Sequence, residues 1–256
     1  MKASLVLLLF LATAFAATPP VPRTADGHPD LSGVWQGGSL SLALGAETAK
    51  QLEQSAQQAA GQPQDTPPPY QPWAAVKRKE YLDRRGIDDP IARCLLPGVP
   101  RATYMPMPIQ ISESAKQVII LYEGFHAFRV IPADGRKHPD DIDASFMGDS
   151  VAHWEGDTLV VDVTGFNDKT WLTGVGTIHS EDLHVTERYT RSRYDMINYD
   201  VTMEDPKVFT KPWVRRSALY LRPGERLREY ECGENNEDVL RYEKLLKNER
   251  LYDGKP

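Results

Sequence analysis

The sequence predicts a mainly β protein, an antiparallel meander closed into a barrel of about ten strands with a helical, proline-rich insertion. Two observations lead to this prediction. From Pro106 onward, short segments of alternating, β-branched or aromatic residues follow one another. Compact turn signals such as Asp134-Gly135 and Pro223-Gly224 separate them. Such a meander removes its exposed edges most simply by closing on itself.

Composition and charge narrow the functional classes. The chain has 256 residues, of which 41% are hydrophobic, enough to build a core. The formal net charge is −6 and the basic residues are interspersed with acids, which argues against a nucleic-acid partner. We expect no cofactor and no serine hydrolase chemistry, because the sequence has no phosphate loop, dinucleotide fingerprint, His-Glu-x-x-His or Gly-x-Ser-x-Gly motif.

The first sixteen residues are typical of a signal peptide. A positive start at Lys2 precedes the apolar run Leu5–Phe10, and Ala14-Phe15-Ala16 has the small-x-small pattern of a cleavage site. The alternative, a membrane anchor, needs a longer apolar run of roughly 20 residues. We therefore expect a periplasmic or secreted protein without a membrane span after cleavage, with residues 17–256 forming one barrel domain.

The mature chain is expected to begin with an extended, proline-rich arm over Thr18–Pro29, followed by a first strand around Trp35. Residues 46–104 form the predicted excursion. In it, Glu47–Ala60 favours a solvent-facing helix or a partly disordered insertion, and Gln62–Pro72 is typical of a stiff linker.

A second helix is predicted over Trp73–Arg85, with Trp73, Val76, Lys77 and Tyr81 forming an aromatic face that docks on the barrel. Asp88-Asp89-Pro90 then indicates a cap followed by a first-turn proline. The predicted strands after the excursion are Ile109–Ser112, Val118–Glu123, Phe125–Ile131, Val151–Glu155, Thr158–Thr164, Leu183–Arg191, Met196–Glu204, Val214–Leu221 and Arg226–Cys232.

The chain has two cysteines, Cys94 and Cys232. In an oxidising compartment such a pair is most simply a disulfide. In the chain-entropy model a bridge over so long a loop stabilises the fold by roughly 4–5 kcal/mol. The alternative, a free thiol nucleophile or metal ligand, lacks support because neither cysteine lies in a ligand-spaced motif.

Strand periodicity singles out Glu187. The inward set of its strand is Leu183, Val185, Glu187 and Tyr189, so the carboxylate is expected among apolar residues. Unless it is paired, burial there would raise its pKa, which suits a general acid or base. The alternative is a structural role in which Arg215 or Arg129 neutralises it.

Histidines give a second candidate. His126 shares a face with Phe128 and Val130, and an inward His126 near Glu187 or Asp168 could transfer protons near neutral pH. The alternative is a core histidine without a catalytic role. The sequence leaves open which face of Phe125–Ile131 lies inside, because both faces carry aromatic residues. No two histidines are spaced as His-x-His or His-x-x-x-His, so we expect no metal site, although one assembled from separate strands stays open.

Two resemblances follow from motifs. The first strand carries Gly33-Val34-Trp35, which is similar to the Gly-x-Trp that closes the barrel base of lipocalins and other calycins. Longer motifs resemble a group of exported bacterial proteins of undefined function, which implies export and no established activity. These motifs are Asp26–Trp35, Cys94–Arg101, Trp154–Asp162, Gly165–Trp171 and His179–Glu187.

The leading functional hypothesis is binding of a small apolar or aromatic molecule in the barrel mouth, under the loop Gly165–Ser180. Two alternatives are a cofactor-free acid–base enzyme (hydrolase, isomerase or lyase) that uses Glu187 or His126, and an envelope structural or interaction protein with a filled barrel. The candidate ligand-binding residues are Arg129, Asn167, Asp168, Trp171, His179 and Tyr199, with His126 and Glu187 as the catalytic candidates.

Overall fold

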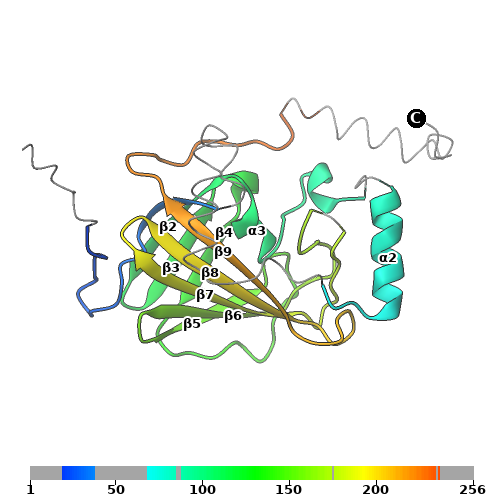
Figure 1. Ribbon diagram of the computed structural model, residues 1–256, viewed down its shortest axis with the longest axis horizontal. Coiled ribbons are helices and arrows are strands. Elements are labelled where there is room, and N and C mark those ends of the chain that lie inside the picture. The colour runs from blue at the N-terminus through cyan, green and yellow to red at the C-terminus, as the bar shows by residue number, and fades with distance from the viewer. Residues whose placement is uncertain (1–18, 38–67, 85–87, 175, 235, 237–256) are drawn as a thin grey trace, which may run out of the picture.

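The computed structural model describes residues 19–37, 68–84, 88–174, 176–234 and 236. The predicted signal peptide and the predicted helix at 47–60 lie outside these residues, as does most of the proline-rich run. The described chain forms one nine-stranded sheet that curves into a nearly closed barrel, with short helices at its periphery (Figure 1). The predicted mainly β barrel with a helical insertion is therefore confirmed.

Every strand ladder in the sheet is antiparallel, in the order β4-β3-β2-β1-β9-β8-β7-β6-β5. The strands are β1 (Gly33–Gln36), β2 (Pro108–Ser114), β3 (Gln117–Tyr122), β4 (Phe128–Pro132), β5 (Asp149–Glu155), β6 (Thr158–Thr164), β7 (His184–Arg193), β8 (Met196–Glu204) and β9 (Trp213–Leu221).

The two ends of the sheet, β4 and β5, meet without a backbone ladder. The nine strands of the sheet alternate in direction, so its two end strands, β4 and β5, run the same way and cannot pair antiparallel. A side-chain contact joins them instead, since Arg129 on β4 donates a hydrogen bond of 2.8 Å to Ser150 Oγ on β5. We call this junction the seam. Residues 133–148, here called the crossover, connect the end of β4 to the start of β5.

The core lies inside the barrel, where alternate residues of the strands point. Trp35, Tyr189 and Tyr199 are among the largest fully buried side chains. At the base, Trp35 Nε1 donates to the carbonyl of Leu31 at 2.9 Å, and the Arg191 guanidinium lies 4.9 Å above the indole ring. Trp35 of β1 is thus held between the chain that precedes it and Arg191 of β7.

Helix α2 (Pro72–Asp83) confirms the predicted second helix, but its predicted docking face is wrong. Trp73 and Val76 are 54% and 62% exposed, and the buried residue is Ala74. Tyr81 does pack inward, with its ring 4.9 Å from that of Trp171. Trp73 also contacts the barrel loops, because its Nε1 donates a hydrogen bond of 3.0 Å to Lys207 O. The helix therefore rests on loops around residues 171 and 207 rather than covering the sheet.

Short turns complete the excursion. Asp89 caps η2 (Pro90–Arg93) by accepting a hydrogen bond from Ile91 N, as predicted, and both its carboxylate oxygens bind Arg101 at 2.7 Å. Arg101 begins α3 (Arg101–Tyr104). The predicted disulfide is confirmed, because Cys94 after η2 is bonded to Cys232.

Two strand predictions are wrong. Residues 226–232 form no strand, because β8 and β1 already occupy both edges of β9 and leave no free edge for a tenth strand. The strand expected over Phe125–Ile131 begins only at Phe128, because η3 (Gly124–His126) has positive φ at Phe125 and His126 and breaks the extended backbone. None of the helices in the described ranges is long and apolar enough to span a membrane.

Candidate functional site

A polar cluster lies inside the barrel around Glu187, whose predicted inward orientation is confirmed by a side chain with 0% exposure. Arg129 Nη2 on β4 forms an ion pair with Glu187 Oε2 at 2.6 Å. The hydroxyls of Tyr189 and Tyr199 donate to Oε1 at 2.9 and 2.6 Å. Each carboxylate oxygen of Glu187 thus has a partner. These contacts agree with the structural alternative, in which Arg129 neutralises Glu187.

The second arginine considered, Arg215, lies elsewhere, with its guanidinium 4.4 Å above the ring of Tyr104. Burial by itself would lower the pKa of Arg129, but the negative charge of Glu187 overcomes this and raises the pKa well above its ordinary value. Burial and the Glu187 charge also raise the pKa values of Tyr189 and Tyr199. The Arg129 guanidinium therefore stays charged, and the two phenols stay neutral.

This arrangement is suited to holding strands together. Glu187 and Tyr199 lie on the neighbouring strands β7 and β8, whereas Arg129 lies on β4 at the end of the sheet and also binds Ser150 across the seam. A general base must reach a proton of its substrate, and a carboxylate that is closed off from solvent by three partners does not offer that access.

His126 does not point into the barrel, so its predicted orientation is wrong. Its side chain is 58% exposed, and Nδ1 lies 3.9 Å from Glu231 Oε2. Phe128 and Val130 are exposed too, whereas Arg129 and Ile131 are buried. Of the two faces that the sequence leaves open, the one that carries Phe128 and Val130 is the outer face, and the turn of η3 separates His126 from the strand.

The loop between β6 and β7 is ordered by its own polar side chains. Asn167 is buried, and its Oδ1 accepts a hydrogen bond of 3.1 Å from Lys169 N, while its backbone N–H donates to Ser145 O on the crossover. Trp171 packs against Tyr81 of α2. Asp168, another of the predicted ligand-binding residues, is exposed. Asn167 and Trp171 therefore fix the loop rather than line an open cleft.

His179 is also buried, with both ring nitrogens occupied. Because a carbonyl only accepts, Nδ1–H donates to Ser180 O at 2.9 Å, and Nε2 then accepts from Thr170 Oγ1 at 2.6 Å. Burial lowers the pKa of His179. Asp205 extends the network by accepting from the backbone N–H and hydroxyl of Ser180. The imidazole is thus a neutral structural bridge within the loop.

A small hollow lies between α3 and the neighbouring ends of β2 and β3. Its volume is about 190 Å³ with its open side included, yet it leaves no space for the centre of a water molecule. The lining is mostly apolar and consists of Pro97, Ala102, Met105, Met107, Pro108, Ile109, Tyr122 and Gly124. The hydroxyl of Tyr122 is 3.5 Å from Thr103 Oγ1, so a polar group borders this apolar space.

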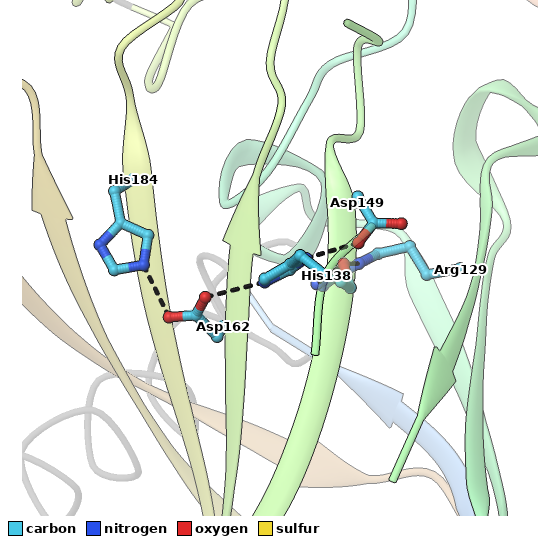
Figure 2. Close-up of polar contacts among 6 residues, drawn as sticks. Arg129, His138, Asp149, Asp162 and His184 are labelled. Carbon is cyan, nitrogen blue, oxygen red and sulfur yellow. Dashed lines mark hydrogen bonds and ion pairs between the residues drawn. The ribbon is translucent and has the colours of Figure 1, made fainter. Parts of the chain in front are cut away.

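A second polar network lies on the outer face and was missed by sequence reasoning. Figure 2 shows His138 of the crossover between Asp149 and Asp162, with His184 on the far side of Asp162. Glu204 continues the row beyond His184. We call these five side chains the histidine–carboxylate ladder. Alternation does place Asp162 and His184 outside, but their proximity depends on strand register, and no local signal positions His138.

Within the described ranges, no group of three or more His, Cys, Asp or Glu side chains is arranged to hold a metal ion. Fold and site together define a β-barrel with an ion-paired interior and a titratable outer network. Comparison of the chain with protein-family models, curated proteins and solved structures finds no match.

Proposed function

We propose that the protein is an exported, lipocalin-like barrel that binds a small apolar or aromatic molecule at one end of the barrel, in the hollow beneath α3. The observation that carries the proposal is the apolar lining of this hollow. Small-molecule sites are commonly concave and mostly apolar, with a few polar groups that orient the ligand. Tyr122 would supply such a group.

Two methionines explain how a closed hollow could open. An added side-chain atom on Gly124 would touch Met107 Sδ, which places the thioether directly over the glycine. Methionine is unbranched and polarizable, so Met105 and Met107 can turn aside and pack against ligands of varied shape. Binding would then replace the contacts of the two thioethers with contacts to the ligand.

Export and family relationship are further parts of the proposal. The Cys94–Cys232 disulfide fits an oxidising compartment, in agreement with the signal-peptide pattern of residues 1–16. The buried Trp35 at the barrel base supports kinship with lipocalins and other calycins. The motif segments support membership in the group of exported bacterial proteins of undefined function.

Native mass spectrometry of the mature protein purified from the periplasm tests for a carried ligand. A mass excess that disappears on denaturation is expected, and its value identifies the molecule. A titration with N-phenyl-1-naphthylamine, a neutral aromatic fluorophore, then locates the site. Gly124→Leu should weaken binding of this probe by about tenfold or more, because the new side chain and the probe compete for one space.

Phe128→Ala is the matched control, because Phe128 is an exposed aromatic residue on the outer face of β4. It should leave the affinity unchanged. Thermal melting confirms that both variants fold. If Phe128→Ala loses the probe while Gly124→Leu keeps it, the apolar binding surface is the outer face and the proposal fails.

A structural or interaction role is the second candidate, favoured by the filled barrel interior. Side chains such as Trp35, Ile120 and Tyr199 have at most 1% exposure. The absence of both a mass excess and probe binding would select this role. The acid–base enzyme has less support, because Glu187 is enclosed and His126 lies outside the barrel.

A further inference from the structure

The histidine–carboxylate ladder alternates acidic and imidazole side chains across four strands and the crossover. Asp149 belongs to β5, Asp162 to β6, His184 to β7 and Glu204 to β8, while His138 belongs to the crossover. The side chains are partly exposed, with values from 19% for His138 to 47% for Glu204. Protons from solvent can therefore reach the ladder.

Each imidazole has carboxylate oxygens at both ring nitrogens. His138 Nδ1 is 2.5 Å from Asp149 Oδ1, and Nε2 is 2.8 Å from Asp162 Oδ1. His184 Nε2 is 2.6 Å from Asp162 Oδ2, and Nδ1 is 3.5 Å from Glu204 Oε2. A neutral imidazole has one N–H and would direct a lone pair at the second carboxylate. All four contacts are therefore attractive only when both rings are charged.

Loss of these protons changes the charge of the ladder. Three carboxylates and two charged imidazoles sum to −1, and two neutral imidazoles leave −3 along the same row. Like charges at such spacing repel each other. The hydrogen bond to Asp162 raises the pKa of His184 above its ordinary value.

Two further ion pairs are formed by charged residues of β5, β7, β8 and β9. Arg188 pairs with Glu155 at 2.8 Å, and Asp200 lies 3.9 Å from Arg216. The groups that face the two imidazoles are therefore Asp149, Asp162 and Glu204, one from each strand beside them.

His138 is the ladder member that can move, because the others lie on strands fixed by backbone ladders. The two ends of the crossover are held by backbone bonds, from Ala133 N to Lys116 O at 2.8 Å and from Ser145 N to Gly165 O at 3.0 Å. Between these ends, His138 fastens the crossover to β5 and β6. The crossover ends at β5, beside the seam.

We propose that the histidine–carboxylate ladder is a proton-operated clasp, which holds the middle of the crossover against β5 and β6 in acid and loosens as the imidazoles lose their protons. The barrel is then clasped beside the seam in acidic surroundings and becomes more mobile there in alkaline ones. The buried Arg129 guanidinium behind the seam keeps its charge throughout.

Amide hydrogen exchange of Ala133 and Ser145, whose N–H groups form the backbone hydrogen bonds at the two ends of the crossover, tests the clasp from about pH 5.5 to about pH 8.5, with correction for the intrinsic pH dependence of exchange. In the wild-type protein, protection should fall by about threefold to tenfold across this range, as expected for a few half-exposed ion pairs. His138→Gln should show the low protection at every pH.

The matched control is His153→Gln. His153 is an exposed histidine on the outer face of β5, with Nε2 3.2 Å from Glu155 Oε1, and it is not part of the ladder. This variant should keep the wild-type profile. Circular dichroism confirms folding of both variants. A wild-type profile that does not change with pH, or a pH dependence that persists in His138→Gln, would overturn the clasp.

Discussion

The barrel wall carries one polar network on its inner face and another on its outer face. Two neighbouring residues of β5 contribute to them, one to the inner network and the other to the outer network. Ser150 points inward and accepts from Arg129, while Asp149 points outward to His138. Both networks pair carboxylates with cations. The inner pair, Arg129 and Glu187, is at most 2% exposed, whereas the outer ladder is 19–47% exposed and uses imidazoles.

The difference shows how environment decides what similar contacts do. Inside, desolvation makes each charge depend on its partner, and arginine does not release its proton. Outside, water and salt screen the charges, and histidine titrates near neutral pH. We therefore expect the inner network to contribute more to stability than the outer one, and the outer one to respond to pH and salt with little effect on total stability.

The largest expected effect comes from breaking the inner pair. Glu187→Ala should lower the free energy of unfolding by about 3–5 kcal/mol, because it leaves the Arg129 charge buried without its counter-ion and two phenols without their acceptor. Urea denaturation followed by tryptophan fluorescence measures the change. A loss below about 1 kcal/mol would mean that the cluster contributes no more than a surface pair.

Replacing both charges sharpens this result. The double variant Arg129→Met with Glu187→Leu should recover most of the lost stability, because apolar residues of similar size remove the desolvation cost together with the attraction. A double variant as unstable as Glu187→Ala would indicate that the Tyr189 and Tyr199 hydroxyls, rather than the charges, hold this part of the barrel.

Glu113 on β2 is intermediate in burial between the inner cluster and the outer ladder. Its substitution should change the free energy of unfolding by an intermediate amount. Burial raises the pKa of this carboxyl to about 7, opposed by the hydrogen bond it accepts from Leu31 N. Because the folded protein binds this proton more tightly than the unfolded chain, its contribution to stability is full below about pH 4.5, falls through the interval and is lost above about pH 7.

Glu113→Gln should therefore stabilise the protein at pH values above this interval and flatten the profile within it. After a discount for partial exposure, we expect a gain of about 1–2 kcal/mol. Thermal melts of wild type and variant at a series of pH values measure it. Two parallel profiles would show that Glu113 ionises alike in the folded and unfolded states.

The smallest effect is expected in the outer ladder. Asp162→Asn removes the carboxylate that both imidazoles share, yet should cost only about 0.5–1 kcal/mol at low salt and less at high salt. Denaturation at two ionic strengths measures this. A salt-independent loss as large as that of Glu187→Ala would mean that exposure does not separate the two networks.

The sequence predicts much of the barrel because its strands alternate clearly. Thr158–Thr164 and Met196–Glu204 are found with the predicted bounds. Glu187 is inside as expected, since its strand carries apolar residues on either side of it in the same face. The disulfide follows from having just two cysteines in the chain.

The failed site predictions have a shared physical origin. In the segment 125–131 apolar residues occur on both faces, so hydrophobicity does not select the inner one, and the buried face carries Arg129 together with Ala127 and Ile131. His126 was assigned to a strand because a positive-φ turn at non-glycine residues leaves no local signal. The ladder depends on register and on the course of the crossover, which are properties of the folded chain.

The strand order also divides the barrel into two sequential meanders, β1–β4 and β5–β9. On one side they touch across the seam. On the other, the β1–β9 ladder joins them at two register positions, Trp35 with Leu221 and Gln36 with Tyr220. Cys94 precedes the last strands of the first meander, and Cys232 follows the second. The disulfide therefore links the two meanders covalently. These meanders are the natural units of partial unfolding.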